Sequence, residues 1–382
     1  MRFAAGRYEV ARDLIHCPLR NIEHNRMRSH VVRRPGFRAF ILMACVTPLT
    51  GLAQVSGPLT IKEQGSFFVG GEQRTVSEPP AGPSPAQSGE ITVNQMYVQY
   101  QIPLKGGRHV PVVFVHGCCL SSKTWETTPD GRMGWSEYFV RKNRSVYLAD
   151  QVSRARSGFD PSAFNEVRSG VRPNAQMPGI LDATHQFAWT VFRFGPKYGE
   201  GFADEQFPLQ AVGELYKQMI PDLNSTLPPS LNPTLTQMAA LGVKLHGAVL
   251  VGHSESGFFP EQAALVDPTG IRGIVTIEIR CDTALTAAQL ATLAKIPTLV
   301  MFGDHLGDVK GPFSWTDALA SCNTFVDQLK KAGGDAEMMY LPALGIKGNS
   351  HMLMQDRNSN QLADLVIGWI DGHVENKKGG TP

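Results

Sequence analysis

The sequence predicts an α/β fold with a mostly parallel central sheet and helices on its faces. Short apolar runs recur along the chain, and helical segments lie between several of them. The runs are VPVVFVHG (110–117), SVYLAD (145–150), GAVLVGHS (247–254), GIVTIE (273–278), PTLVMFGD (297–304) and EMMYLP (337–342). Strands that are apolar along their whole length are buried on both faces, as in parallel sheets.

A further strand and several helices complete the predicted domain. ITVNQMYVQYQI (91–102) is rich in β-branched and aromatic residues, as strands are. The helical segments are 256–266, 284–294, 316–332 and 358–371. We expect N-terminal strands and a Pro-, Gly- and Ser-rich linker over 54–90, the domain over 91–374, and a flexible tail at 375–382.

The interval between residues 150 and 247 is too long for a simple crossover between parallel strands. Because it is rich first in aromatics and then in prolines, we expect a helical cap at about 155–245. Caps of this kind usually shape the substrate pocket. Candidate pocket residues are Trp125, Trp135, Phe187 and Trp189, although large aromatics also occur as plain core residues.

Residues 1–53 have the character of a targeting segment. Arginines at 28, 33, 34 and 38 precede an apolar run, AFILMACVTPLTGLA (39–53), the layout of a secretory signal peptide over about 27–53. The run contains Pro48 and Gly51 and is short for a membrane span; a membrane-proximal anchor or a buried element are the alternatives. We expect translation from Met27, cleavage near Ala53, and a secreted or periplasmic protein without a membrane span.

Composition excludes several partners. The net charge is +2 and the body of the chain has no basic run, so nucleic-acid binding has little support. Of six cysteines, Cys17 and Cys45 fall in the targeting segment, and four remain for an oxidising compartment. No CxxC pair or Cys/His cluster has zinc spacing, so we expect no metal and no organic cofactor.

The central motif is GHSESG (252–257), directly after an apolar strand and before a helical segment. A sharp strand-to-helix turn raises a serine above the sheet and needs small residues two positions away on either side. Ser256 stands where Gly is commoner. The motif predicts Ser254 as a nucleophile; an ordinary turn is the alternative.

A serine hydroxyl needs a base to remove its proton. Where a serine stands on such a strand-to-helix turn, the acid and then the histidine follow it along the chain. His351 follows the last predicted strand, whereas His305 directly follows PTLVMFGD and His373 lies near the end. We therefore predict His351 as the base. The acid stays open between Glu278, at the end of GIVTIE, and two aspartates that follow the next strand, Asp304 and Asp308.

A tetrahedral intermediate needs two N–H donors for its oxyanion. We expect one from the backbone of Glu255, whose side chain should point away, and one from the loop that follows VVFVHG. Cys118 and Cys119 stand in that loop, either joined as a vicinal disulfide that would rigidify it or as two free thiols. In the first case Cys281 and Cys322 would form a second, conventional bridge.

Together these motifs resemble the α/β-hydrolase superfamily over about 91–374. A narrower resemblance is to atypical secreted bacterial esterases with a Cys-Cys pair at the oxyanion hole. The segments that carry it are HGCCLSSKTWETTPDGRMGWSEYF (116–139), FRFGPKY (192–198), QFPLQA (206–211) and LPALGIKGNSHMLMQDRN (341–358).

The resemblance implies a Ser-His-Glu triad of Ser254, His351 and Glu278, with backbone amides of Cys118 and Glu255 as oxyanion donors. It also implies a Cys118–Cys119 disulfide and a homodimer. The chain departs from the pattern in two places: Glu255 stands where an uncharged glutamine is expected, and Ile279-Arg280 replaces a Pro-Gly-like turn.

The expected function is hydrolysis of a small carboxylic ester through an acyl-enzyme. A lactonase or amidase with the same triad is the enzymatic alternative. A non-catalytic secreted binding protein on a hydrolase scaffold is the alternative from another class.

Overall fold

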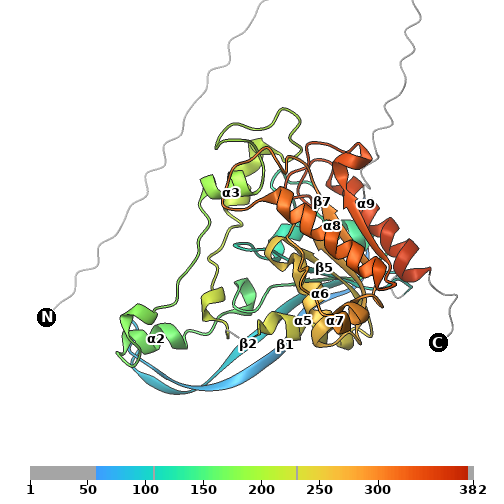
Figure 1. Cartoon of the computed structure of the whole chain (residues 1–382). Helices are drawn as coiled ribbons and strands as arrows, with labels where there is room; N and C mark the ends of the chain where they lie inside the picture. The colour runs from blue at the N-terminus through green and yellow to red at the C-terminus, as the bar shows by residue number, and fades with distance from the viewer. Residues whose placement is uncertain (1–56, 106–107, 229–230, 377–382) are drawn as a thin grey trace, which may run out of the picture. The chain divides into compact units, whose positions relative to one another are not determined.

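The central element is an eight-stranded sheet with the order β1-β2-β4-β3-β5-β6-β7-β8. A computed structural model describes residues 57–105, 108–228 and 231–376 (Figure 1). β1 pairs antiparallel with β2 and β2 with β4, and the remaining neighbours are parallel. The predicted α/β fold with a mostly parallel sheet is confirmed.

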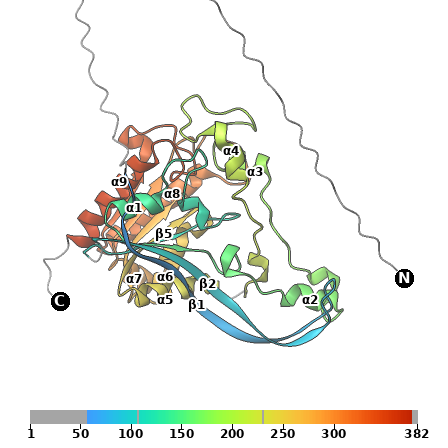
Figure 2. The same cartoon turned by 180° about the vertical axis from the view of Figure 1, so that it is seen from behind.

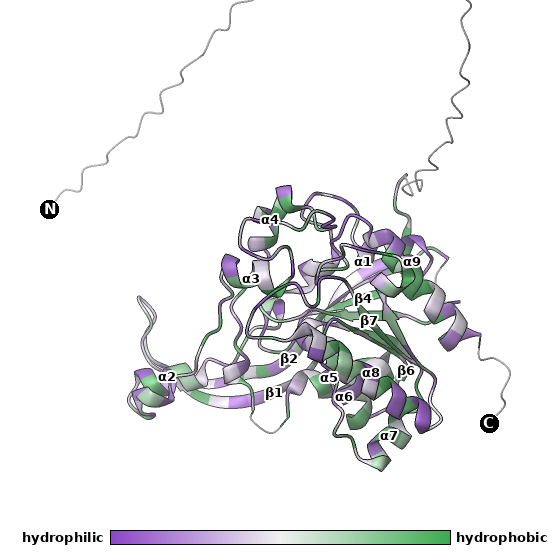
Figure 3. Ribbon diagram, turned by 45° about the horizontal axis from the view of Figure 1, so that its top comes forward, coloured by the Kyte–Doolittle hydropathy of each residue, from purple (hydrophilic) through white to green (hydrophobic). Residues whose placement is uncertain are grey.

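Each apolar run forms a strand. The strands are β3 (Val112–Val115), β4 (Val146–Ala149), β5 (Ala248–His253), β6 (Ile271–Ile277), β7 (Thr298–Phe302) and β8 (Ala336–Tyr340). Side chains alternate between the two sheet faces: Val112 and Phe114 join one buried cluster, whereas Val113 and Val115 join the other. Both faces are therefore covered, and Figure 3 shows hydrophobic colour along the central strands.

Two sets of helices cover the sheet. On one face lie α1 (Trp135–Arg141) and α9 (Ser359–Ile370), as Figure 2 shows. The other face carries α5 (Pro233–Lys244), α6 (Phe259–Val266), α7 (Ala287–Leu293) and α8 (Trp315–Lys331). Two helices begin later than predicted. Ser254–Phe258 forms a 3-10 turn before α6, and the Thr286 side chain accepts a hydrogen bond from Gln289 N at the start of α7.

The N-terminal strands differ from the prediction. β1 (Ile61–Glu78) and β2 (Gln87–Pro103) form one long antiparallel hairpin that belongs to the main sheet (Figure 1). The Pro-rich stretch predicted as a linker at 79–90 contains the tip of this hairpin and the start of β2. Most of β1 has exposed side chains on both faces, so its sequence lacks the alternation that marks a half-buried strand.

The insertion between β4 and β5 contains more than a cap. α2 (Ser162–Arg168) packs at the hairpin tip, where Arg168 donates to the carbonyl oxygen of Pro80 (2.9 Å). α3 (His185–Val191) and α4 (Val212–Tyr216) follow, and buried residues from both join the cluster that includes the loop around Met352. α5, which the sequence placed in the cap, instead packs on the sheet.

The chain end also differs from the expected tail. Glu375 accepts hydrogen bonds from the backbone N–H of Val110 (2.9 Å) and from the Arg144 guanidinium (2.8 Å). The start of the predicted tail is therefore bound to the domain. The predicted signal peptide lies outside the described residues. Within the described ranges, no helix combines the length and the apolar character that crossing a bilayer requires.

Two disulfides are present in the described part of the chain, Cys118–Cys119 and Cys281–Cys322. We expect Cys281→Ala/Cys322→Ala to lower the free energy of unfolding by about 4 kcal/mol, because the bridge closes a loop across a sequence separation of 41. Urea unfolding without reductant measures this. Cys118→Ala/Cys119→Ala is the control, since that bridge closes no chain loop; equal losses in both variants would contradict the prediction.

Candidate active site

Ser254 lies on a strained turn between β5 and the 3-10 turn that precedes α6. Its φ is 56°, a left-handed value that is unusual for a residue other than glycine. Gly252 packs against the backbone of Ser256, where a Cβ would collide with the Ser256 carbonyl. Ser256 is buried, and its hydroxyl donates to the carbonyl oxygen of Val115 (2.9 Å). The position where glycine is commoner thus holds a serine that ties the turn to β3.

The loop after β3 lies directly against Ser254. A Cβ on Gly117 would stand 2.5 Å from the Cβ of Ser254 and 3.1 Å from its Oγ. The vicinal disulfide Cys118–Cys119 follows at once, with Cys119 at a φ of 60°. The Cys119 carbonyl accepts from Ile220 N (2.9 Å), so the insertion holds this loop from outside. Backbone groups of the loop and of the serine turn therefore adjoin.

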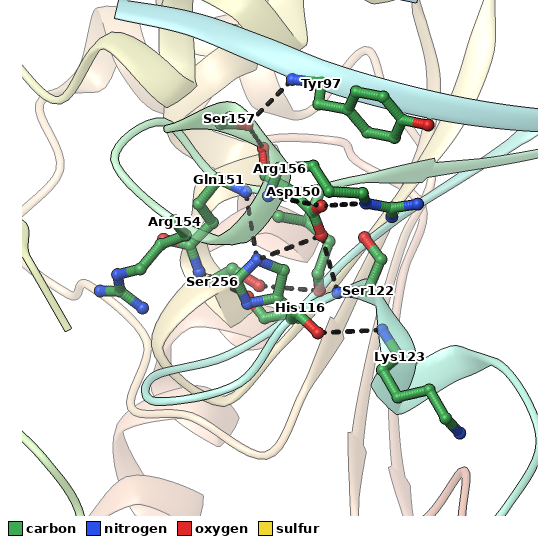
Figure 4. Close-up of polar contacts among 12 residues, drawn as sticks. Tyr97, His116, Ser122, Lys123, Asp150, Gln151, Arg154, Arg156, Ser157 and Ser256 are labelled. Carbon is green, nitrogen blue, oxygen red and sulfur yellow. Dashed lines mark hydrogen bonds and ion pairs between the residues drawn. The ribbon is translucent and has the colours of Figure 1, made fainter. Parts of the chain in front are cut away.

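A buried polar network around His116 and Asp150 supports this loop (Figure 4). Nδ1 of His116 donates to the carbonyl oxygen of Gly117 (2.9 Å), and its Nε2 accepts from Gln151 N (3.1 Å). Asp150 accepts from Ser122 N (2.8 Å) and from Nε of Arg156 (2.6 Å). Burial lowers the pKa of His116 to about 4, so its ring is neutral near pH 7, as one donor and one acceptor nitrogen require.

His351 is fully buried, and two other segments of the chain hold its loop. Its backbone N–H donates to the carbonyl oxygen of Phe192 (2.9 Å), and its own carbonyl accepts from Nε2 of His253 (2.9 Å). Its ring stacks on Phe192 at 5.3 Å between centroids. Nε2 of His351 is buried and has no hydrogen-bond partner among the described residues. Burial lowers the pKa of this imidazole, so it is neutral near pH 7.

Among the three predicted acids, Glu278 is the one that contacts His351. Its Oε2 lies 3.2 Å from Nδ1 of His351, and its φ of 59° turns it back after β6. Asp304 instead accepts from the backbone N–H groups of His305 (2.7 Å) and Gly348 (3.0 Å). The exposed Asp308 pairs with Nδ1 of His305 (2.8 Å). The Ile279-Arg280 departure does not prevent Glu278 from reaching the imidazole.

Sequence reasoning missed Arg193. Its Nη1 and Nη2 donate to the two carboxylate oxygens of Glu278, at 2.8 and 2.7 Å, and both side chains are fully buried. Burial alone would raise the pKa of Glu278, but the Arg193 charge and the hydrogen bond from His351 lower it to about 2. An arginine between two phenylalanines in an insertion gives little sequence signal; only its place in FRFGPKY singled the segment out.

The side chain of Glu255 pairs with a buried arginine that it shares with Asp222. Arg154 lies 3.2 Å from its carboxylate and 2.6 Å from that of Asp222, and Asn224 also donates to Glu255. Burial raises the pKa of Glu255, and the Arg154 charge opposes that rise. Glu255 stands where a glutamine is expected, and Arg154 pairs with its charge. The carboxylate is therefore ion-paired rather than free beside Ser254.

The four aromatic pocket candidates occupy different environments. Trp125 and Trp135 are fully buried and pack on Phe114, with ring centroids 4.8 and 6.2 Å away. Trp189 is also buried, with its ring 5.8 Å from that of Phe194, whereas Phe187 is exposed. Trp125 and Trp135 are therefore core residues by their packing. A pocket role for Phe187 and Trp189, on α3, stays a prediction.

Three groups of described side chains bring metal-ligand atoms close together, and all of them have partners within the protein. In the first, two members are joined as the vicinal disulfide; in the others, Arg144 or His305 already pairs with the carboxylates. The groups are Cys118, Cys119 and Asp222; His109, Asp371 and Glu375; and Asp204, Asp304 and His305.

Comparison with known proteins places the chain in a family. No family model matches it. A probable secreted lipase, phiG, from a fungal species (strain ATCC 74256) is 24% identical over 329 residues, covering 72% of this chain and 85% of the relative. The atomic-resolution structure of a novel bacterial esterase is 48% identical, with a TM-score of 0.79, and the match covers 84% of this chain and 98% of that one. The chain therefore belongs to the family of this bacterial esterase, within the α/β-hydrolase superfamily.

Proposed function

We propose that the protein is a carboxylesterase-type serine hydrolase that cleaves small carboxylic esters through an acyl-enzyme. The observation that carries the proposal is the contact between Glu278 and Nδ1 of His351 (3.2 Å), in a domain whose β5–α6 turn presents Ser254. The esterase and lipase relatives support the reaction class. Burial of both triad partners matches a site that works outside bulk water.

In the proposed first step, Nε2 of neutral His351 takes the Ser254 proton while Oγ attacks the ester carbonyl carbon. Glu278 keeps Nδ1–H of His351 in place and stabilises the imidazolium that forms. The oxyanion is held by the backbone N–H groups of Cys118 and Glu255. The imidazolium then gives its proton to the leaving alcohol, and the ester bond breaks.

Water completes the cycle. His351 removes a proton from a water molecule, the hydroxide attacks the acyl-enzyme, and the acid leaves as Ser254 regains its proton. The carboxylate of Glu255 is paired with Arg154, so it does not stand without a cation beside the oxyanion site. The same steps would open a lactone or an amide, so the substrate profile distinguishes these activities.

Two further sequence expectations stay predictions under this function. Secretion is supported by the fungal relative, a probable secreted lipase. Cleavage near Ala53 stays a prediction from the sequence. The homodimer rests on the resemblance to the secreted bacterial esterases.

Ser254→Ala should abolish hydrolysis of short and medium p-nitrophenyl esters, because the other hydroxyl of this turn, on Ser256, is buried and donates to the carbonyl oxygen of Val115. A fluorophosphonate should label the unmodified protein and not the variant. Ser88→Ala, on the exposed part of β2, is the control and should keep full activity. Equal turnover by Ser254→Ala, or no turnover and no label with the unmodified protein, would argue for the binding-protein alternative.

Glu278→Gln should lower kcat by about 10²- to 10⁴-fold, because a triad without its acid loses the orientation and charge support of the histidine. Asp308→Asn should leave kcat unchanged, since its exposed carboxylate contacts His305. Steady-state kinetics with p-nitrophenyl butyrate measure both. A large loss in Asp304→Asn with a small loss in Glu278→Gln would move the acid assignment to Asp304.

Gly117→Ala should lower kcat/KM by about 10²-fold, because the added Cβ would stand 2.5 Å from the Cβ of Ser254 and displace the nucleophile or the oxyanion loop. Gly179→Ala is the matched control, since its Cβ would meet no atom within 4 Å. Circular dichroism checks that both variants fold. Undiminished activity in Gly117→Ala would show that the loop does not abut the reacting serine.

A further inference from the structure

Arg193 lies at the meeting point of the candidate triad and the β4–β5 insertion. It follows α3 directly, has a φ of 58° and is fully buried. Its Nε donates to the carbonyl oxygen of Asp304 (2.7 Å), and its guanidinium lies over the Trp315 ring at 4.7 Å. With the two hydrogen bonds to Glu278, one side chain joins the ends of β6 and β7 to the insertion.

The carboxylate of Glu278 has donors on both oxygens. Oε1 accepts from Nη2 of Arg193 and from Gly303 N (2.5 Å); Oε2 accepts from Nη1 of Arg193 and from Nδ1 of His351. A bidentate guanidinium sets the plane of a carboxylate as well as its position. The direction in which Oε2 meets His351 is therefore determined by Arg193 and Gly303.

The residue before Arg193 holds the histidine. The Phe192 carbonyl accepts from His351 N (2.9 Å), and its ring stacks on the imidazole. The Trp315 ring contacts both His351 and Arg193. Its centroid lies 4.6 Å from that of the His351 ring, and the Arg193 guanidinium lies over it. One dipeptide of the insertion thus contacts both the base and the acid of the candidate triad.

We propose that Arg193 is a positioning residue of the active site: it keeps Glu278 a carboxylate and aims its Oε2 at Nδ1 of His351. The proposal rests on the proposed function, since it assigns a role relative to that triad. Arg193 acts through Glu278 and touches neither the nucleophile nor the candidate oxyanion loop in the contacts described. Its loss therefore affects the chemical step rather than substrate binding.

Charge makes this role measurable. Burial lowers the pKa of His351, Glu278 raises it and the Arg193 cation lowers it. Removing the cation raises the pKa of His351, so the neutral, active base disappears at a higher pH and the acidic limb of kcat/KM moves upward. Lysine keeps the charge but not the bidentate geometry, so it separates orientation from electrostatics.

Other titratable groups face these residues. His253 packs on His351 at 4.6 Å between rings, and burial lowers its pKa to about 3. Burial raises the pKa of Asp356 to about 7, and the Arg193 charge opposes that rise. The Asp356 carboxyl accepts a hydrogen bond from Ser350 N, next to His351. Tyr340 and Asp304 lie near the guanidinium. Because the pKa of Asp356 is about 7, a change in the pH profile needs a second, independent readout.

The experiment is a double-mutant cycle on the full-length protein with Arg193→Met, Glu278→Gln and the combined variant, assayed with p-nitrophenyl butyrate. We expect Arg193→Met to lower kcat by about 10- to 100-fold with little change in KM, a part of the loss that removal of a triad acid causes. In the Glu278→Gln background the same substitution should have almost no effect on kcat. The acidic limb of Arg193→Met should move to higher pH, whereas Arg193→Lys keeps the limb in place.

Arg144→Met is the matched control, because Arg144 is a buried arginine that pairs with Glu375 at the other end of the chain. It should reduce stability and leave kcat and the pH profile unchanged. Equal losses from Arg193→Met in both backgrounds would show that Arg193 does not act through Glu278 and would overturn the proposal. If Arg193→Met does not fold, the same cycle with Arg193→Lys decides between these outcomes.

Failure of this inference is distinct from failure of the proposed function. An active protein that Ser254→Ala inactivates, but that tolerates Arg193→Met, contradicts only the role of Arg193. A protein in which Ser254→Ala has no effect contradicts the triad itself.

Discussion

The site depends on a buried carboxylate that must stay charged. Glu278 has no contact with solvent, and an isolated charge there would be protonated rather than ionised. The bidentate contact with Arg193, the N–H of Gly303 and Nδ1 of His351 supply the compensation. Each donor comes from a different segment, so the ends of β6 and β7, the insertion and the histidine loop must all be in place together.

The part of the candidate site around Ser254 is organised by close packing instead of charge. Gly117 leaves no room for a Cβ against Ser254 and the His253 carbonyl, so the loop after β3 lies directly on the turn after β5. Gly252 packs as closely on the Ser256 carbonyl within that turn. Ser256 stands where glycine is commoner, and its hydroxyl donates a hydrogen bond to β3. The neutral His116 and the Asp150 network hold the same loop, and the vicinal disulfide follows Gly117 in it.

The sequence predicted the strands whose side chains are buried, and it predicted less well the elements whose side chains are exposed. The six apolar runs became strands because both sheet faces are covered, which leaves a continuous hydrophobic signal. The strand predicted at 91–102 lies within β2, whereas the length of β1 was not predicted, because most side chains of β1 are exposed and carry no alternation. α5 was assigned to a cap because a helix that covers the sheet and a helix that covers a pocket have the same amphipathic pattern.

By itself, the sequence determined Ser254 and His351 as candidates, because a strand-turn-helix motif and a fixed chain order are local properties. It left Glu278, Asp304 and Asp308 open, since neighbouring parallel strands end at the same sheet edge and bring all three near one place. Only the tertiary structure chose the contact between Glu278 and His351, and only it revealed Arg193. The physical reason is that a charge partner is selected by distance and burial in space, and neither quantity is encoded in chain spacing.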